Sequence, residues 1–365
     1  SVVVRQGFEA EQVRLRAMAA ELSTRRLEQI QKLTAHRYGA PVRFRNVRIF
    51  DPQEMALSAP VSVVISGRHI SSIQPIDSAV SPGEVLVEGE GGTLVAGLYE
   101  MHAHTGQEGA LLNIAAGVTS ARDMGNDNAV LDALIARIEA GTIGGPRIHR
   151  SGFIEGKSPF NSNNGILVDS EAETLAAVRW YAARGYGQVK LYNSMKPEWS
   201  AVAAKEAHRL GLRVAGHVPA FSNADAMVDA GYDELTHINQ IALGWVLSPE
   251  EDTRTLLRLT ALKRLATLDL ASAPVQRTLD HIASRKVAVE PTIAIHENLL
   301  LNRGGAVPAG AVDYIDHLPV GEQRGARQGW ADMSAPGDAE AYAAAYAKLL
   351  DTLRQMRQRG ILLIP

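Results

Sequence analysis

From residue 93 onward, strand patterns alternate with helical patterns, and this alternation constrains the fold more than any other feature of the chain. Most of the helical segments end in glycine, which readily adopts the left-handed conformation that terminates a helix. Such alternation predicts a parallel sheet with right-handed crossovers. The expected strands are 95–104, 118–123, 146–152, 188–192, 213–218, 234–239, 287–296 and 361–364, and the expected helices are 111–117, 130–141, 171–185, 197–211, 224–231, 249–285 and 339–360. Eight strands favour an α/β protein built as a (β/α)₈ TIM-like barrel, ahead of a doubly wound open sheet.

A helical extension precedes the predicted barrel. It occupies residues 1–40, where Leu15, Met18 and Leu22 recur at helical spacing between charged side chains. This pattern predicts an amphipathic helix over residues 8–36. We expect the helix to pack on its own subunit. The alternative is a contact between subunits, and we expect a homo-oligomer.

A small β domain is predicted for residues 41–92. Residues 42–50 largely alternate apolar and polar side chains, and residues 61–65 and 69–73 form a predicted hairpin. We expect an antiparallel arrangement that is too short for a core of its own. It should therefore be part of a small β-sandwich that is incomplete without C-terminal partner strands. The barrel then occupies residues 93–365.

Composition narrows the function classes. The net charge of −3 and the near-neutral balance argue against nucleic acid or a membrane surface as the main partner. The chain has no cysteine, which excludes disulfides and thiolate metal sites. No apolar run approaches the ~20 residues that span a bilayer. We therefore expect a soluble protein. The chain begins with Ser1 rather than Met, which suggests processing, so the expected compartment is either the cytoplasm or the exterior after removal of a signal.

Two histidines end the first predicted barrel strand. His102 and His104 are two positions apart, so on a strand their side chains point to the same face. At the C-terminal end of a strand, two such imidazoles can bind one metal ion. The motif alone is weak evidence, because a chain with 11 histidines can contain it by chance.

Three more candidate ligands lie at the ends of later predicted strands. They are Lys190, His217 and His237, and in a barrel all these strand ends share one rim. Taken singly, each has a structural explanation as a hydrogen-bonded core histidine or a snorkelling lysine. Burying four imidazoles and an amine together without a ligand would leave many polar groups unsatisfied. The joint pattern therefore favours a bound ligand.

This arrangement resembles the metal-dependent amidohydrolase superfamily. Within it, the pattern is similar to binuclear members with a carboxylated lysine, such as the imidazolonepropionase-like and prolidase-like hydrolases. The resemblance extends from about residue 42 to residue 365. It includes the Gly97-Leu98 step before the histidines and the stretch GVTSARDMG at residues 117–125.

The resemblance implies a binuclear metal centre. His102 and His104 would hold one divalent ion, His217 and His237 the other, and Lys190, carboxylated by carbon dioxide, would bridge both. A free ammonium cannot bind a cation, whereas a carbamate is an anion with two oxygens. The implied reaction is attack of a metal-bridging hydroxide on an amide or peptide-like C–N bond. Zinc is the first expectation, and Mn, Co and Ni suit the same ligands.

One essential residue of the resembled family has no counterpart here. The family has an aspartate after strand eight, and in this chain residues 361–364 lead up to that point before the sequence ends at Pro365. We expect the intact protein to continue with the aspartate, an eighth helix and the partner strands of the β domain. The chain that ends at Pro365 should be impaired unless a separate C-terminal fragment completes the fold.

The substrate is expected to bind in the loops above the strand ends. Tyr192 and His296 are candidates for polarising the scissile carbonyl, and Lys157 is a candidate for contacting a substrate carboxylate. The prediction is a metal-dependent amidohydrolase acting on a small-molecule amide or peptide-like substrate. The alternatives are hydrolysis of an ester, lactone or phosphoester by the same site, or a non-catalytic scaffold subunit.

Overall fold

The computed structural model describes residues 5–365, and the chain divides into two compact units. Among these residues, the first unit contains residues 5–99 together with Gly106–Ser120 and Leu134–Arg147, and the second contains Glu100–Thr105, Ala121–Ala133 and Ile148–Pro365. No helix within the described residues is long and apolar enough to cross a membrane.

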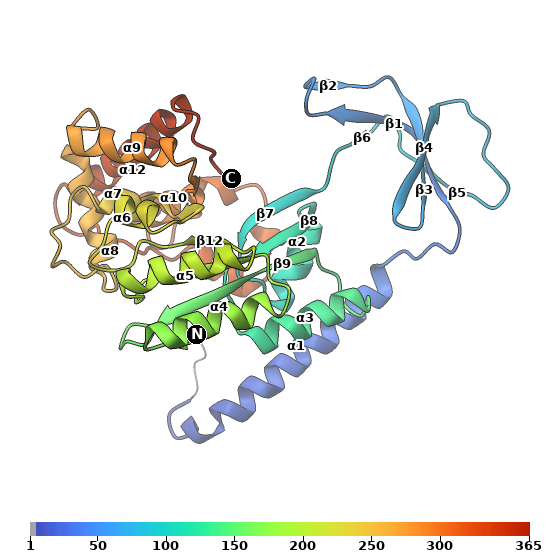
Figure 1. Ribbon diagram of the computed structural model, residues 1–365. Coiled ribbons are helices and arrows are strands. Elements are labelled where there is room, and N and C mark those ends of the chain that lie inside the picture. The colour runs from blue at the N-terminus through green and yellow to red at the C-terminus, as the bar shows by residue number, and fades with distance from the viewer. Residues whose placement is uncertain (1–4) are drawn as a thin grey trace. The chain divides into compact units, whose positions relative to one another are not determined.

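The first unit contains a six-stranded sheet organised around β1 (Figure 1). Its strands are β1 (Val42–Asp51), β2 (Ala56–Leu57), β3 (Val61–Ser66), β4 (His69–Pro75), β5 (Val85–Glu88) and β6 (Thr93–Leu94). The predicted hairpin is confirmed as β3 and β4, joined at Gly67 with φ +59°. The expectation of a purely antiparallel arrangement is wrong, because β5 and β6 both run parallel to β1.

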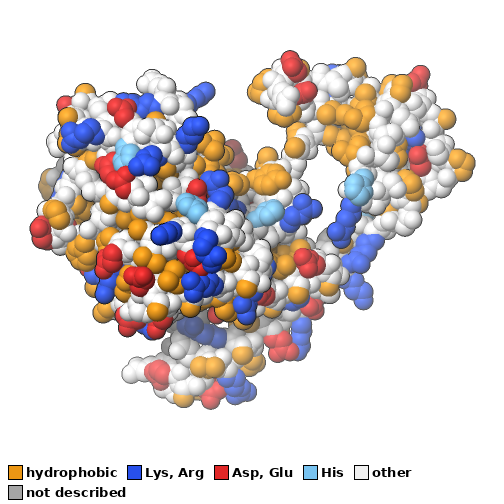
Figure 2. Space-filling view, viewed as in Figure 1, with side chains coloured by type: hydrophobic (Ala, Val, Ile, Leu, Met, Phe, Trp, Pro, Cys, Tyr) orange, Lys and Arg blue, Asp and Glu red, His pale blue; other side chains and the backbone are white. Residues whose placement is uncertain are grey.

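The predicted N-terminal helix is present in the first unit. A short 3₁₀ turn, Glu9–Glu11, leads into α1 (Gln12–Thr34). The helix contacts α2 (Gln107–Ala115), where Ser23 donates to Glu108 at 2.7 Å. Only Leu27 is buried among its described residues, and Leu22 is 61% exposed. Apolar side chains are also visible on the surface of the six-stranded sheet (Figure 2), where Ile70 and Ile73 are exposed.

The second sheet is parallel, nearly closed, and follows chain order. Its strands are β7 (Leu98–Ala103), β8 (Val118–Asp123), β9 (Arg147–Gly156), β10 (Ile166–Val168), β11 (Gln188–Leu191), β12 (Arg213–Gly216), β13 (Glu234–Thr236) and β14 (Ala288–Glu290). The path runs β7-β8-β9-β11-β12-β13-β14, with β10 beside β9. The order confirms the predicted TIM-barrel fold class.

Helices follow most of these strands. They are α3 (Asn128–Glu139), α4 (Glu171–Ala182), α5 (Pro197–Arg209), α6 (Ala224–Asp229), α7 (Ile238–Leu243), α8 (Leu257–Thr260), α9 (Ala273–Ser284), α10 (Ile293–Leu301), α11 (Val320–Ala326) and α12 (Asp338–Gln358). Figure 1 shows α4 and α5 running side by side, and α5 packs on β11 and β12. At the end of β12, a Cβ on Gly216 would lie 2.2 Å from the Leu191 carbonyl oxygen.

The segment predicted to begin strand eight lies beside β14. Leu363 forms a parallel bridge with Val289, and Val289 donates its backbone N–H to Leu362 at 2.9 Å. The pairing matches the predicted position of this strand in the barrel order.

Several predicted elements differ from the structure. The strand expected over residues 234–239 ends at Thr236, and α7 begins at Ile238. The strand expected over residues 287–296 ends at Glu290, because Pro291 cannot donate to a ladder and Thr292 adopts a left-handed φ of +45°. The chain then enters α10, so His296 lies on a helix rather than at a strand end. The helix expected over residues 249–285 is divided into α8, a 3₁₀ helix at Ala261–Thr267, and α9.

Candidate metal centre

The structure brings all five predicted ligands together at the C-terminal ends of β7, β11, β12 and β13. Lys190 Nζ lies 3.1 Å from Nε2 of His102. The ring centroid of His102 lies 5.4 Å from that of His104 and 4.7 Å from that of His237, which in turn lies 4.5 Å from His217. All five residues belong to the second unit.

The hydrogen bonds of His104 and His217 fix their tautomers. Nδ1 of His104 donates to the Gly125 carbonyl oxygen at 2.6 Å, and Nδ1 of His217 donates to Asn193 Oδ1 at the same distance. A neutral imidazole that donates from Nδ1 keeps an unprotonated Nε2, which is a metal-ligating lone pair. Partners of this kind on the distal nitrogen are characteristic of metal-bound histidines.

His237 is held in the same tautomer by a strained turn. Thr292 donates its hydroxyl proton to the Pro291 carbonyl at 2.8 Å, so its Oγ1 accepts from Nδ1 of His237, at 2.7 Å. Both His237 and Thr292 have positive φ values, +66° and +45°. Non-glycine residues rarely adopt this conformation, and such strain concentrates at functional sites.

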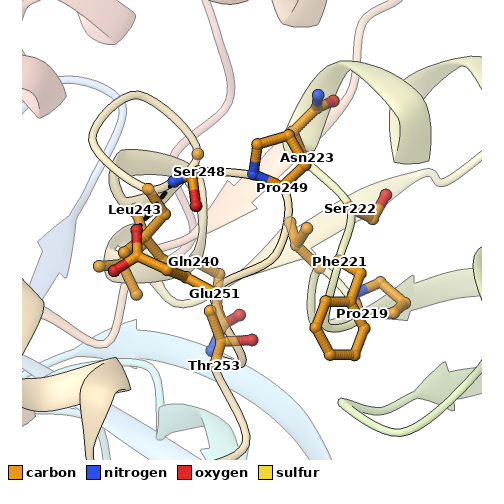
Figure 3. A pocket seen from close by; sticks show the side chains of 13 residues that line it. Pro219, Phe221, Ser222, Asn223, Gln240, Leu243, Ser248, Pro249, Glu251 and Thr253 are labelled. Carbon is orange, nitrogen blue, oxygen red and sulfur yellow. Dashed lines mark hydrogen bonds between the residues drawn. The ribbon is translucent and has the colours of Figure 1, made fainter.

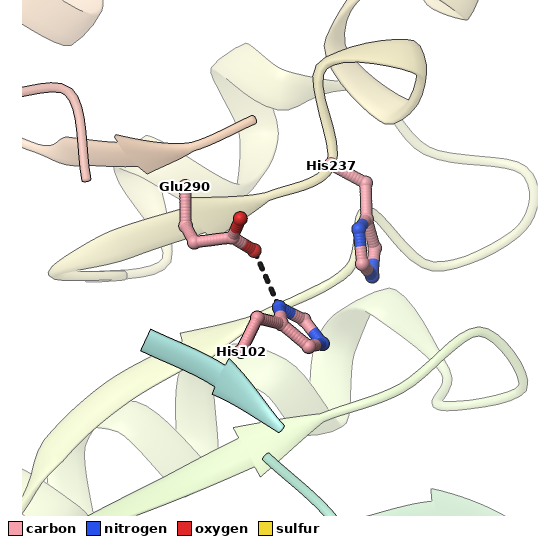
Figure 4. A group of neighbouring side chains, drawn as sticks. All are labelled: His102, His237 and Glu290. Carbon is pink, nitrogen blue, oxygen red and sulfur yellow. Dashed lines mark hydrogen bonds and ion pairs between the residues drawn. The ribbon is translucent and has the colours of Figure 1, made fainter. Parts of the chain in front are cut away.

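His102 is the fourth histidine with a partner on Nδ1. Its partner is a carboxylate that the sequence analysis missed. Figure 4 shows Glu290, at the end of β14, in contact with Nδ1 of His102. The other Glu290 oxygen accepts the backbone N–H of Thr292 at 2.8 Å. Because Nε2 of His102 faces the Lys190 amine, its Nδ1 carries the proton and donates to Glu290. Ligand atoms of Glu290, His102 and His237 lie within 4.8 Å of one another, so this carboxylate could also reach a metal.

One observation, which does not depend on the family resemblance, indicates that the four histidines and Lys190 fit a metal centre. Nε2 of His217 is buried and has no hydrogen-bond partner among residues 5–365. An unpaired buried polar atom is costly, and a native protein retains one where something binds it. The four imidazole lone pairs, together with the carbamate that forms when the lysine is carboxylated, make up a ligand set that binds divalent ions.

Lys190 is fully buried on β11. Within the described part of the chain its ammonium contacts no carboxylate at salt-bridge distance, and its hydrogen bond is to His102. Burial lowers the pKa of this lysine to about 7, although the nearby Glu290 carboxylate acts in the opposite direction. A neutral amine is therefore abundant near neutral pH.

Burial also keeps the four histidines neutral. Desolvation, reinforced by Lys190, lowers the pKa of His102 to about 2. The same cause lowers the pKa of His104, and it holds the pKa values of His217 and His237 well below the usual range. Neutral imidazole is the form that ligates metals.

Asp123 is a second positioning residue that the sequence analysis left without a role. Its buried carboxylate accepts the backbone N–H groups of Thr105 at 2.7 Å and of Gly125 at 3.1 Å, and the side-chain amide of Asn126 at 3.1 Å. These bonds fix the loop after His104 and the carbonyl that receives its Nδ1 proton. Asp123 and Glu290 both lie at strand ends, which is the signal that could have identified them.

The residues predicted to contact substrate are found in different surroundings. The Tyr192 ring lies 4.0 Å from the His217 ring, next to the cluster. His296 is buried on α10, where its Nδ1 donates to the Thr292 carbonyl at 2.9 Å. Lys157 lies near Glu173 at the surface, with Nζ 3.4 Å from the carboxylate.

Comparisons with known proteins show which solved structures share this fold. No protein-family model matches the chain, and no curated protein sequence matches it. Among solved structures, a Xaa-Pro dipeptidase with bound methionine is 18% identical, with a TM-score of 0.57 over 89% of this chain and 78% of its own. Bottromycin amidohydrolase is also 18% identical, with a TM-score of 0.59 over 93% and 70% of the two chains. The ochratoxinase of A. niger is 14% identical, with a TM-score of 0.54 over 90% and 75%.

The chain therefore shares its fold with these three structures. This finding agrees with the fold that the resemblance implied. At identities this low, the likeness establishes the fold.

Proposed function

We propose that this protein is a metal-dependent hydrolase that cleaves an amide or peptide-like C–N bond in a small molecule. The observation that carries the proposal is the shared tautomer of four clustered histidines, each of which donates from Nδ1 to the protein and keeps Nε2 as a lone pair. Structural histidines have no common reason to adopt this arrangement around a buried lysine.

The proposed centre holds two divalent ions. The ligands are His102 and His104 for one ion, His217 and His237 for the other, and carboxylated Lys190 for both. When bound, the ions supply a water of lowered pKa and polarise a carbonyl group. Zinc is the first choice, and Mn, Co and Ni suit the same ligands.

The environment of Lys190 favours its carboxylation. In the neutral amine the nitrogen lone pair attacks the carbon of carbon dioxide, an N–C bond forms as one C=O π bond breaks and its electron pair moves to oxygen, and the nitrogen gives one proton to water or bicarbonate. The product is a carbamate with two oxygens. The reaction needs the unprotonated amine, and the lowered pKa of about 7 supplies it near neutral pH.

Tyr192 and His296 take different proposed roles because their surroundings differ. His296 donates from Nδ1 to a backbone carbonyl, so its Nε2 can accept a proton but cannot polarise a carbonyl while the ring is neutral. Burial lowers the pKa of His296, which keeps it neutral. The Tyr192 ring lies beside the cluster, and because it carries a phenolic O–H this residue is the better candidate for donating to the scissile carbonyl.

The test combines metal analysis with a substrate panel. The protein, loaded with zinc in bicarbonate buffer, is analysed for bound metal and assayed on dipeptides and N-acyl amino acids, matched esters, a lactone and a phosphoester. We expect close to two ions per chain and cleavage of amides. Lys190→Met should lose the metal and reduce kcat/KM by roughly 10³-fold or more. Lys205→Met, at an exposed position on α5, is the matched control and should change neither.

Two results would contradict the proposal. A wild-type protein without stoichiometric metal would support a scaffold instead of an enzyme. Cleavage of the esters, lactone or phosphoester without any cleavage of amides would move the activity to another bond type.

A further inference from the structure

The first half of α1 carries apolar side chains that face solvent. All residues from Val13 to Leu22 are exposed, and among them Leu15, Met18 and Leu22 are 44%, 45% and 61% exposed. These three side chains follow one another at spacings of three and four residues, so they form one apolar stripe along a single face of the helix. A helix that is open to solvent along much of its length gains little stability from its own sequence, and an exposed apolar stripe marks an interaction surface.

The apolar stripe faces away from the rest of the first unit. Ser23 and Thr24 donate their hydroxyl protons to two side chains of α2, at 2.7 and 2.9 Å, and Leu27 is buried. Each residue turns a helix by about 100°, so these three side chains lie roughly half a turn away from the stripe. Because α1 packs on its own unit through the opposite face, the stripe is open to a partner.

A second group of exposed apolar side chains differs, because the protein itself supplies their partner. Phe221 lines the cavity drawn in Figure 3 and is 51% exposed. The guanidinium of Arg254 lies 5.2 Å from the centre of this ring and 5.4 Å from that of Phe160, and it is neutralised by two hydrogen bonds of 2.8 Å to Asp252. This cation–π contact occupies one face of each ring. The two rings are therefore less suited to docking a partner than the apolar stripe of α1.

The apolar stripe is symmetric about its own midpoint. Leu15 and Leu22 lie equally far from the point between Met18 and Ala19. When two copies of a helix pair in antiparallel orientation about a two-fold axis, each residue meets the residue at the mirrored position of the other copy. Such a pair would place Leu15 against Leu22 of the partner subunit and Met18 close to the axis. Apolar side chains at this spacing are the ones that interlock between paired helices.

The charges at the two ends of the stripe follow the same symmetry. Glu11 and Arg26 also lie equally far from the midpoint. Glu11 contacts Arg14 at 3.2 Å, but 46% and 75% of these two side chains are exposed, so the pair adds little stability and can exchange partners. An antiparallel pair brings Glu11 to Arg26 of the partner subunit at both ends. A parallel pair would instead place like charges side by side, so charge complementarity favours the antiparallel arrangement.

We propose that a second copy of this chain covers the apolar stripe, and that the two α1 helices pair antiparallel in a two-fold symmetric dimer. The helix α1 belongs entirely to the first unit, whereas the clustered histidines belong to the second, so this inference does not depend on the proposed hydrolase function. One helix of 23 residues supplies a contact at the small end of protein interfaces. The dimer should therefore be weak and dissociate in the micromolar range.

The first experiment measures self-association. The metal-free 365-residue chain is examined by sedimentation velocity over a range of micromolar concentrations, where we expect a monomer–dimer equilibrium. Leu22→Glu places a charge in the apolar contact and should weaken the dimer at least tenfold. Val13→Glu is the matched control, because Val13 is 80% exposed on the opposite face of α1, and it should change nothing.

Disulfide trapping tests the orientation of the two helices. The chain has no cysteine, so introduced cysteines link only where the copies meet. Met18→Cys should cross-link to itself, and a mixture of Leu15→Cys and Leu22→Cys should cross-link as a heterodimer. Leu15→Cys alone should react several-fold more slowly, since the helical rise separates its two copies by roughly 10 Å, beyond the ~7 Å limit between the Cα atoms of a disulfide.

Charge exchange tests the ends of the stripe. Glu11→Arg and Arg26→Glu should each weaken the dimer by about threefold to tenfold, and the double variant should restore it. A wild-type protein that is monomeric at every concentration would overturn the proposal, and if that monomer bound anionic lipid vesicles, the stripe would belong to a membrane surface instead. Fast self-linking of Leu15→Cys, or a dimer that Leu22→Glu does not weaken, would also overturn it.

Discussion

Two basic side chains inside the parallel sheet differ in how the protein compensates their charge. Arg122, on β8, forms a two-pronged pair with Glu234, at 2.6 and 2.7 Å, and donates from Nε to the Met101 carbonyl. Lys190, on β11, is more deeply buried and contacts no carboxylate at salt-bridge distance within the described residues. The arginine is satisfied by the protein itself and is structural. The lysine has no such partner in the protein. This difference identifies the end of the sheet at which a ligand is needed.

The largest expected effect comes from breaking the satisfied pair. Arg122→Met leaves Glu234 buried without its partner, so the free energy of unfolding should fall by about 3–5 kcal/mol. Denaturant titration of the metal-free protein measures the change. Arg354→Met, in an exposed pair with Asp351, is the control and should cost less than about 1 kcal/mol. A similar small loss for Arg122→Met would remove the contrast between the two cations.

The histidine cluster should make the metal-free protein sensitive to acid. The unfolded chain binds these protons with a pKa near 6.5, whereas the folded pKa values are lower. The stabilisation is therefore complete above pH 6.5 and is lost as the pH falls below it, by up to about 1.4 kcal/mol per pH unit for each histidine.

Two carboxylates oppose this trend. The pKa values of Glu290 and Glu155 are both raised to about 7, chiefly by burial, so their contributions grow as the pH falls from 7 to 4.5. The four clustered histidines and His296, whose pKa burial also lowers, outnumber these two glutamates, and the net stability should decrease in acid. Unfolding titrations at pH 8, 6 and 5 with a chelator test the sign, and His217→Gln should flatten the slope. A profile that is already flat in the wild type would contradict the buried neutral histidines.

A medium effect is expected for the carboxylate that orients His102. Glu290→Gln keeps the shape of the side chain but removes the charge that receives the Nδ1 proton, so metal affinity should fall about 10–100-fold. Competition with a chromophoric chelator measures it. Glu297→Gln, on the same α10 segment as His296, provides a control that should not alter the affinity. An unchanged affinity in Glu290→Gln would show that this contact does not support the metal.

The smallest expected effect sharpens the comparison most. Lys190→Met replaces a buried cation without a carboxylate partner by an apolar chain of similar length, so the metal-free protein should be as stable as wild type or more so. The measurement is the same denaturant titration used for Arg122→Met. A loss of several kcal/mol would mean that Lys190 is a structural residue like Arg122.

The sequence predicted the barrel and the clustered ligands because both depend on local rules. Strand and helix periods and glycine stops fix the order of the elements, and a shared rim follows from parallel strands. The same reasoning failed at residues 287–296, where Pro291 and the left-handed Thr292 end the strand after three residues and start a helix. The strain at Thr292 is imposed by contacts with His237 and Glu290, which no local pattern records.

The supporting residues of the site were harder to predict than the ligands. Glu290 and Asn193 are ordinary polar residues at strand ends, and their roles depend on which histidine nitrogen they face. Which nitrogen faces which partner depends on the tertiary structure, because the partners are far apart in the sequence. The role of Arg122 was likewise hidden, since its partner Glu234 is distant in the sequence.

The close approach at Gly216 limits how this site can vary. Position 216 directly precedes His217, and any side chain there would collide with the Leu191 carbonyl oxygen, 2.2 Å from the position of a Cβ. That oxygen accepts the His217 backbone N–H at 3.0 Å, so the collision would displace the imidazole itself. In a saturation library, the codon for residue 216 should tolerate only synonymous changes, as strictly as the codon of the neighbouring histidine.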